Sequence, residues 1–325
     1  MSGDHERAGF QALAAVGPDE DDAAKALAAR LKTAPRPQDL KALAALWVHA
    51  AAAAPERGPA IFDAAAEGWL GKPVGGLAIK TARGKPEPIP TAFWEALWAL
   101  LDEAPGKATA GNVTTRTAAL AGLVAPSIVE RVARAALSYP GVAAAAGQGF
   151  PKKFTLEALA RCPPGSLGND LHRLVLEEGF DLEPLDRETL GLEKLSPPLG
   201  YLNARILQCH DLWHIVAGYQ TTALHEVAIS AFQMAQFGHH YSSMFLAMVL
   251  TRVAFERPEG GPLLLETILT AWVHGRRTPP LLPVKWETLW AKPVAEVRSA
   301  LGVTPYVSPL PADIFEQLRT AADAA

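Results

Sequence analysis

The chain has 325 residues with a formal net charge of −4, and 49% of its residues are hydrophobic. This length can bury the core of one large or two modest domains, and the mildly acidic balance excludes the basic face that a nucleic-acid partner requires. The two cysteines, Cys162 and Cys209, are not in a paired spacing, which favours a reduced, cytoplasmic setting over a disulfide framework. The first residues lack the basic-then-apolar order of a secretory signal. The sequence contains no run of about 18 apolar residues, so a transmembrane helix is not predicted.

In chain order, the first half of the sequence shows the three- and four-residue apolar spacing of helices. Acidic residues open the first predicted helix and basic residues close it, which suits the helix dipole. Residues 71–90 hold four prolines and four glycines and are predicted to form a loop. The predicted helices of this half span residues 20–32, 38–54, 61–71, 91–104 and 117–138, the last interrupted at Pro126.

The composition changes at about residue 148, where alanine becomes rarer and prolines, glycines and polar residues become more position-specific. This change predicts an alanine-rich helical N-terminal region of unassigned role at residues 1–147 and a second helical region at residues 148–325. Helical spacing continues in the second half and strand-like alternation is nearly absent. The predicted fold class is therefore all-α, an irregular multi-helix bundle.

An apolar helix is predicted over residues 227–255, and it contains Met234, Met244 and Met248. Flexible thioether side chains suit an adaptable apolar surface, so this helix is interpreted as core, as the wall of a lipid channel, or as both. On a straight helix, His239 and His240 would lie about 20 Å from Glu226, and they are left out of the candidate site.

The candidate site lies in HDLWHIVAGYQTTALHE, residues 210–226, which follows the helical pattern of residues 201–217. His210 and His214 are one turn apart on a helix and differ by only about 40° in direction, so both imidazoles can bind one cation. Asp211 lies about 100° around the helix from His210, where it can bind the same cation or orient a histidine.

Glu226 can join this site only if the helix ends. On a continuous helix it would point about 120° away from His214. Gly218 can break the helix, and Thr221 or Thr222 can act as the N-cap of a second helix that returns Glu226 toward the histidines. The sequence therefore predicts a helix break within a residue or two of Gly218 and a helix–turn–helix pair that shares one metal ion.

The spacing alone leaves other interpretations open. The histidines could be ordinary core residues, and Glu226 could serve only the dipole of its own helix. A zinc hydrolase of the HExxH type would need a general base at the position of Asp211, whose side chain is one methylene shorter than glutamate.

Several blocks resemble the coenzyme Q (ubiquinone) biosynthesis protein 4 family in order and spacing. HDxxH followed after eleven residues by Glu resembles the signature of that family, and YLNARILQCHD resembles the helix that leads into it, with its arginine at Arg205. The segment 154–171, FTLEALARCPPGSLGNDL, is similar to a family segment that precedes the metal motif. The segment 272–303 is similar to the C-terminal end, with Gly-Arg-Arg before a Trp-containing helix.

The resemblance implies a helical protein of the ubiquinone pathway. Family members are associated with removal of the C1 carboxyl from a polyprenylated 4-hydroxybenzoate-type ring, with hydroxylation at that carbon, and with organising the other ubiquinone biosynthesis proteins. We therefore expect a metal-dependent, oxidative C1 decarboxylase at the membrane surface, or alternatively a non-catalytic lipid-binding scaffold with a structural metal. A metal-dependent phosphohydrolase would need more distant His and Asp ligands, which the sequence does not supply in recognisable form.

The resemblance also implies the site residues and partners. The metal ligands would be His210, Asp211, His214 and Glu226. Zinc is the foremost expectation, with iron(II), manganese or magnesium as alternatives. Expected partners are a polyprenylated hydroxybenzoate or quinone precursor, other ubiquinone biosynthesis proteins, a peripheral membrane contact and a possible second copy of the chain, at a cytoplasmic location. Arg205 could bind a substrate carboxylate or form an ion pair. The Gly-Arg-Arg arginines could pair with anionic groups or simply be solvated.

Overall fold

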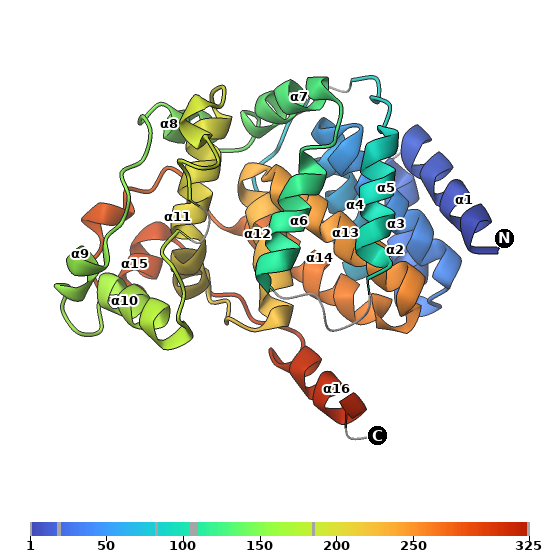
Figure 1. Cartoon of the computed structure of the whole chain (residues 1–325). Helices are drawn as coiled ribbons and strands as arrows, with labels where there is room; N and C mark the ends of the chain where they lie inside the picture. Colours follow the sequence, from blue (N-terminus) through green and yellow to red (C-terminus); the bar gives the residue numbers. More distant parts are fainter. Residues whose placement is uncertain (1, 18–20, 82–83, 104–109, 184–185, 324–325) are drawn as a thin grey trace.

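The structure is a computed structural model of the chain, and it describes residues 2–17, 21–81, 84–103, 110–183 and 186–323 (Figure 1). Helices account for the regular structure of these ranges. The one β feature within them is an isolated bridge between Ser166 and Pro293. The predicted all-α class and the irregular multi-helix architecture are confirmed.

Proline and glycine set the helix boundaries of the first half. Pro37 and Pro126 each occupy the first turn of a helix, where the missing N–H costs no hydrogen bond, and Gly71 ends a helix in the left-handed conformation. The helix predicted at 117–138 is therefore two helices, as its proline indicated. The helices of this half are α1 Ser2–Val16, α2 Asp21–Thr33, α3 Pro37–Ala52, α4 Gly58–Leu70, α5 Thr91–Leu101, α6 Ala110–Ala121, α7 Pro126–Ala136 and α8 Val142–Ala146.

The second half contains one helix boundary that the sequence analysis missed. The single helix predicted over 227–255 is wrong, because Gly238 adopts φ 66° and divides the segment into two helices. His239 and His240 consequently lie at a turn and not in mid-helix. The helices of this half are α9 Leu156–Ala160, α10 Leu167–Glu178, α11 Leu199–Ala217, α12 Ala223–Phe237, α13 His240–Glu256, α14 Gly261–Arg277, α15 Val294–Leu301 and α16 Ile314–Asp323.

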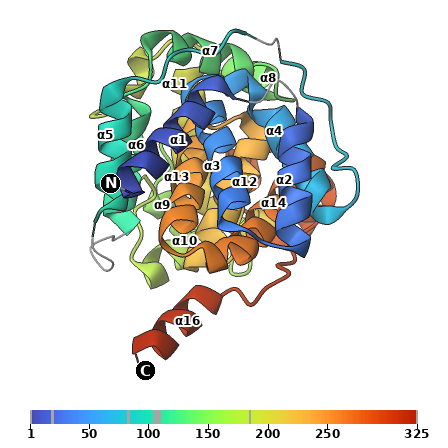
Figure 2. The ribbon, with the colours of Figure 1, turned by 90° about the vertical axis from the view of Figure 1, so that its right-hand side faces the viewer.

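The N-terminal helices and the second half share one hydrophobic core. Helix α3 packs on α13 and α4 packs on α14, and the view from the N-terminal side shows α1–α4 lying over α12–α14 (Figure 2). Phe62 stacks on Trp47 at 4.4 Å between ring centroids and contacts Trp272 at 5.0 Å. The change of composition at residue 148 therefore does not coincide with a gap in the core.

The two arginines of the Gly-Arg-Arg segment bind other parts of the chain. Arg276 is buried and pairs with Asp63 of α4 at 3.1 Å. Arg277 donates to the carbonyls of Val74 and Pro73, in the predicted 71–90 loop, at 2.7 and 3.2 Å. Both guanidinium groups thus join the N-terminal region to α14, and the structure gives them internal partners in place of the anionic ligands considered from sequence.

Helices α12 and α14 cross at very close range. A Cβ atom at Gly275 of α14 would lie 2.7 Å from the Ala235 Cβ and 2.8 Å from the Phe232 carbonyl oxygen on α12. Only glycine permits this separation, because a real Cβ atom cannot approach backbone so closely. The crossing holds the second half of α12 against the core.

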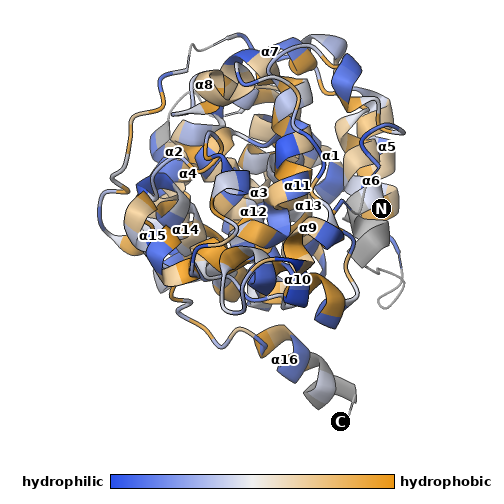
Figure 3. Ribbon diagram, turned by 90° about the vertical axis from the view of Figure 1, so that its left-hand side faces the viewer, coloured by the Kyte–Doolittle hydropathy of each residue, from blue (hydrophilic) through white to orange (hydrophobic). Residues whose placement is uncertain are grey.

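The opposite side of the molecule carries α9, α10, α15 and α11. Polar and apolar residues alternate around these helices (Figure 3), and α16 extends away from the body beyond the start of α12 (Figures 1 and 3). Among the described residues, no helix is both long enough and apolar enough to span a membrane.

We predict that Gly275→Val lowers the free energy of unfolding by about 2–3 kcal/mol, because the added side chain overpacks the α12–α14 crossing. Chemical denaturation of the full chain measures this. The matched control is Gly9→Val on the exposed face of α1, where a Cβ atom meets nothing within 4 Å. Equal effects of the two substitutions would contradict the close crossing.

Candidate metal centre

Helix α11 presents three potential metal ligands within little more than one turn. His210, Asp211 and His214 offer ligand atoms that all lie within 4.8 Å of one another. The helix ends where the sequence predicted, because Gly218 adopts φ 84° and ψ 30° and its N–H donates to the His214 carbonyl. The prediction of a helix break at Gly218 is confirmed.

The chain then turns back and α12 begins at Ala223, so that Glu226 lies in the first turn or so of the second helix. Thr222 occupies the N-cap position, one of the two that the sequence indicated. Its side chain makes no capping hydrogen bond and donates instead to the Ala312 carbonyl at 2.6 Å. Thr222 is therefore at a predicted N-cap position, but the side chain that accepts a hydrogen bond from the first turn of α12 belongs to another part of the chain.

The turn brings the Glu226 carboxylate against both imidazoles. Its Oε2 lies 3.2 Å from Nε2 of His210, and its Oε1 lies 3.2 Å from Nε2 of His214. The two Nε2 atoms are themselves 3.2 Å apart. Two nitrogen donors and one carboxylate therefore converge on a common point, with the Asp211 carboxylate beside them.

Backbone hydrogen bonding fixes the tautomer of His214. Its Nδ1 lies 3.0 Å from the carbonyl oxygen of Gln220. Because a carbonyl can only accept, Nδ1 carries the proton and the lone pair is on Nε2, facing Glu226. This arrangement, in which the far nitrogen is anchored and the near one is free, is typical of histidine ligands to metals.

Gln233 plays the corresponding part for His210, and sequence reasoning did not single it out. Its side-chain amide lies 2.8 Å from Nδ1 of His210. Gln233 is seven residues beyond Glu226, which places both on the same face of α12 with His210 between them. A carboxamide can present either its NH₂ or its oxygen, so Gln233 can pair with either tautomer of His210. The sequence signal for this role is the seven-residue spacing between Glu226 and Gln233, which places both side chains on one helix face.

The donor set fits a divalent cation. When His214 is neutral, the lone pair of its Nε2 faces a carboxylate oxygen at 3.2 Å, and two acceptors at that distance repel each other. One proton on His210 can bridge to Glu226, but it leaves the contact between His214 and Glu226 without a hydrogen. A cation among the three side chains would satisfy every one of these acceptors at once.

The electrostatic environment favours an ionised Glu226. Burial acts to raise its pKa, but the hydrogen bonds and positive charges of His210 and His214 in their protonated forms hold the pKa well below its usual value. Burial also acts to lower the pKa of His210, and the hydrogen bond and charge of Glu226 outweigh it and raise that pKa. Burial raises the pKa of Asp211. Glu226 is therefore anionic near neutral pH.

The site is open on one side. The His214 side chain is 2% exposed and lies at the base, whereas 41% of the Glu226 side chain is accessible to solvent. A small molecule can therefore approach Glu226 and His210, whose side chain is 31% exposed, whereas His214 is covered by the core.

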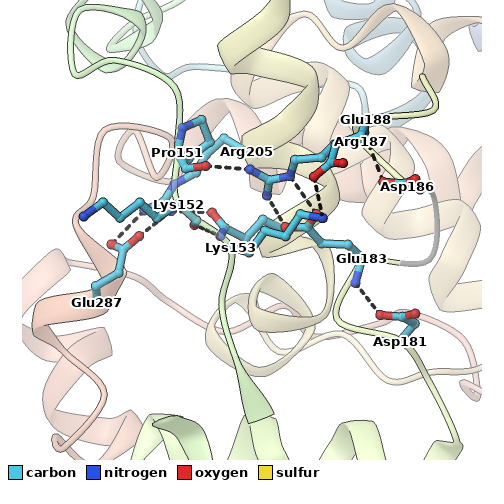
Figure 4. Close-up of polar contacts among 11 residues, drawn as sticks. Pro151, Lys152, Lys153, Asp181, Glu183, Asp186, Arg187, Glu188, Arg205 and Glu287 are labelled. Atoms are coloured by element: carbon cyan, nitrogen blue, oxygen red, sulfur yellow. Dashed lines mark hydrogen bonds and ion pairs between the residues drawn. The ribbon is translucent and has the colours of Figure 1, made fainter. Parts of the chain in front are cut away.

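Arg205 has partners within the protein, in place of the substrate role considered from sequence. Its buried guanidinium forms a two-point ion pair with Glu287, at 2.7 and 3.1 Å (Figure 4). It donates as well to the Val284 carbonyl at 3.0 Å. It also donates to Oε1 of Gln208, and the side-chain NH₂ of Gln208 donates in turn to the Lys152 carbonyl. A substrate carboxylate would have to displace Glu287, so the geometry makes Arg205 a buried structural clamp.

The other residues weighed in the sequence lie in the core or at turns. Met234, Met244 and Met248 are all buried. Met234 and His240 line a cavity of about 20 Å³, enough for about one water molecule. An apolar cavity of about 460 Å³ lies instead between α1, α2 and α3, and none of its lining residues belongs to α11 or α12. The core interpretation of the methionines agrees with this packing.

We predict that Gly218→Ala lowers the free energy of unfolding by about 2–4 kcal/mol, since left-handed backbone strain adds to a clash. The new Cβ would lie 2.8 Å from the Cβ of Pro305. Gly71→Ala is the matched control, because Gly71 has φ 65° but nothing within 4 Å; it should cost only about 1 kcal/mol. Urea denaturation of both variants measures the difference, and equal losses would argue against the contact with Pro305.

We predict a pH-dependent contribution from the Arg205–Glu287 pair. Burial acts to raise the pKa of Glu287, but the hydrogen bond and charge of Arg205 bring it below the ordinary value of 4.5. Its stabilisation is thus present above pH 4.5 and lost as pH falls through the lowered pKa. Glu287→Gln should cost about 1 kcal/mol at pH 7, because half-exposed pairs are screened, and progressively less below pH 4.5. A pH-independent difference in denaturation midpoints would refute this.

Comparison with known proteins assigns the second half of the chain. The family model described as Coenzyme Q (ubiquinone) biosynthesis protein Coq4 matches residues 150–307. The protein named Ubiquinone biosynthesis protein COQ4 homolog, mitochondrial, from Drosophila melanogaster is 34% identical over 109 residues, which cover 34% of this chain and 40% of that protein. The protein of the same name from Mus musculus is 27% identical over 152 residues, which cover 46% and 54%.

A solved structure shows the same relationship. A crystal structure from Nostoc punctiforme, of a protein whose description places it in ubiquinone biosynthesis, aligns with a TM-score of 0.50 and 25% sequence identity. The alignment covers 66% of this chain and 95% of that one. The chain thus spans about half the length of the curated relatives it matches and nearly all of the solved protein. The resemblance seen in the motif blocks is confirmed: residues 150–307, slightly under half of the chain, match the coenzyme Q (ubiquinone) biosynthesis protein Coq4 family.

Proposed function

We propose that this chain takes part in ubiquinone biosynthesis by holding one divalent metal ion at His210, Asp211, His214 and Glu226. The observation that carries the proposal is the convergence of both imidazole Nε2 atoms on the Glu226 carboxylate at 3.2 Å. The family match to residues 150–307 supplies the pathway. Because the match spans only part of the curated relatives, the activity, substrate and partners below are proposals for this chain.

Zinc is the first choice of metal for this donor set. Imidazole nitrogen with carboxylate oxygen suits zinc, iron(II) and manganese, whereas magnesium prefers a shell of oxygen atoms. Gln220 and Gln233 anchor the far nitrogens of the two histidines, so the near nitrogens are free to bind.

The reaction proposed is oxidative loss of the C1 carboxyl from a polyprenylated 4-hydroxybenzoate-type ring. In balanced form, the aryl acid, dioxygen, two protons and two electrons give the phenol, carbon dioxide and water, so the reaction needs an external two-electron donor. The metal, when bound, would act as a Lewis acid toward the carboxylate or phenolate oxygen of the ring. The open side at Glu226 admits the ring, and the buried His214 closes the site behind it.

The prenyl chain implies contact with a membrane surface. A polyprenylated acid partitions into lipid, so we propose that the protein meets its substrate as a peripheral membrane protein, alone or with other ubiquinone biosynthesis proteins. The curated relatives are named as mitochondrial proteins; the cytoplasmic location expected from sequence remains a prediction.

A non-catalytic scaffold is the second candidate function. The observation in its favour is that the ligands come from two helices joined by a short turn, so a metal ion there would fasten α11 to α12. In that case the metal would contribute to folding, as structural zinc does in small domains, and the protein would organise pathway enzymes without reacting with the ring.

We predict that the purified protein binds about one equivalent of zinc and that His210→Ala and Glu226→Ala weaken binding more than about 100-fold. Gln233→Leu should weaken it by about 10- to 100-fold, because the orienting hydrogen bond to His210 is lost. His5→Ala, which changes an exposed histidine of α1, is the control and should bind zinc as the unmodified protein does. Chelator competition measures the affinities of the four variants and of the unmodified protein. Failure of the unmodified protein to bind any divalent metal would refute the site.

The two candidate functions are separated with a folded, metal-deficient variant. Glu226→Ala is assayed for release of labelled carbon dioxide from a prenylated acid labelled in its carboxyl, and for ubiquinone content in cells that depend on the protein. Catalysis requires that both fall while circular dichroism shows an intact fold. Restored ubiquinone with no carbon dioxide release by the purified protein would favour the scaffold.

A further inference from the structure

The turn that brings the metal ligands together is held by the end of the chain. Residues 303–316, here called the C-terminal strap, cross the turn formed by residues 218–222. The strap connects α15 to the first turn of α16, and α16 itself stands away from the body next to the start of α12 (Figures 1 and 2).

The last carbonyls of α11 are satisfied from this part of the chain. Arg298 of α15 donates to the Ile215 and Val216 carbonyls at 2.6 and 2.9 Å, and the N–H of Tyr306 donates to the Ala217 carbonyl at 2.8 Å. These carbonyls have no partner within their own helix. The end of α11, about one turn beyond His214, is therefore closed by contacts from the C-terminal segment.

Aromatic packing fixes the strap over the turn. Tyr306 stacks on Tyr219 of the turn at 4.6 Å between ring centroids. The Tyr219 hydroxyl donates to Nδ1 of His274, and Nε2 of His274 donates to the Thr304 carbonyl, each at 2.8 Å. Pro305 lies directly against Gly218, where only a hydrogen atom fits in place of a side chain. The strap and the turn thus form one rigid unit.

The first turn of α12 depends on the strap as well. Its N-cap residue, Thr222, makes no capping bond and donates to the Ala312 carbonyl. The N–H of Ala223 donates instead to Oε1 of Glu316, at 3.0 Å, from 93 positions further along the chain. A carboxylate at this place satisfies a free N–H and faces the positive end of the helix dipole.

We infer that Glu316 is a positioning residue for the metal centre: by capping α12 it sets the first turn that carries Glu226 against His210 and His214. Glu226 is three residues beyond Ala223 on this turn, so movement of the helix start displaces its carboxylate directly. Ala312 and Glu316 both lie past residue 307, where the match to the family model ends. The inference rests on the proposed metal site.

The test compares zinc affinity and backbone protection in three variants of the full chain. Glu316→Ala should raise the zinc dissociation constant by about 3- to 10-fold, the range expected for losing one helix cap, and should speed hydrogen exchange at the Ala223 amide. Glu316→Gln keeps an acceptor oxygen and should restore affinity to within about 2-fold. Gln317→Ala is the matched control, because Gln317 is exposed and its side-chain amide donates locally, to Asp313 just before α16.

Each outcome decides the inference separately from the proposed function. If the unmodified protein binds zinc and Glu316→Ala binds it equally well, the inference is wrong and the metal site stands. If Glu316→Ala lowers only the melting temperature, Glu316 is structural and the inference is again wrong. If the unmodified protein binds no zinc, the proposed function fails, and the imidazole ¹⁵N signals of His210 and His214 decide: a shift in Glu316→Ala, absent in Gln317→Ala, supports positioning, and no shift overturns it.

Discussion

The contact between Glu226 and the two imidazoles depends on the left-handed conformation of Gly218. On a continuous helix, Glu226 would point about 120° away from His214. At φ 84° the chain reverses within five residues, and the start of α12 returns its carboxylate to 3.2 Å from both histidines. A side chain at this position would strain the backbone and meet Pro305. The candidate metal centre, the open side of the site and the path of the C-terminal strap all follow from this reversal.

The parts of the site that sequence could predict are those determined by neighbouring residues. Two histidines at a spacing of four share a helix face through the helical repeat alone, and a glycine between two helical patterns marks a break. The same local rules predicted the proline-bounded helices of the first half. They failed at Gly238, which lies inside the single helix predicted over 227–255 and divides that run into α12 and α13.

The parts that sequence could not predict are contacts between distant positions. A substrate role was considered for Arg205 because its partner, Glu287, is 82 positions away and no residue near Arg205 in the sequence indicates the pairing. The N-cap of α12 could be located at Thr222, but its hydrogen bond comes from Glu316, 93 positions away. Gln233 orients His210 only because α12 folds back along α11. In each case a local pattern left one polar group unsatisfied, and the tertiary fold determined its partner.

The central claim is that the convergent side chains of α11 and α12 hold a metal ion through both imidazoles. X-ray absorption spectroscopy of the zinc-loaded full chain tests this most directly, because scattering from imidazole rings is distinct from scattering by carboxylates or water. The account predicts a first shell with two imidazole nitrogens at about 2.0–2.1 Å and oxygen ligands at about 2.0–2.2 Å, and loss of the imidazole signal in His210→Ala. A shell of oxygen atoms alone, or one containing sulfur, would contradict it.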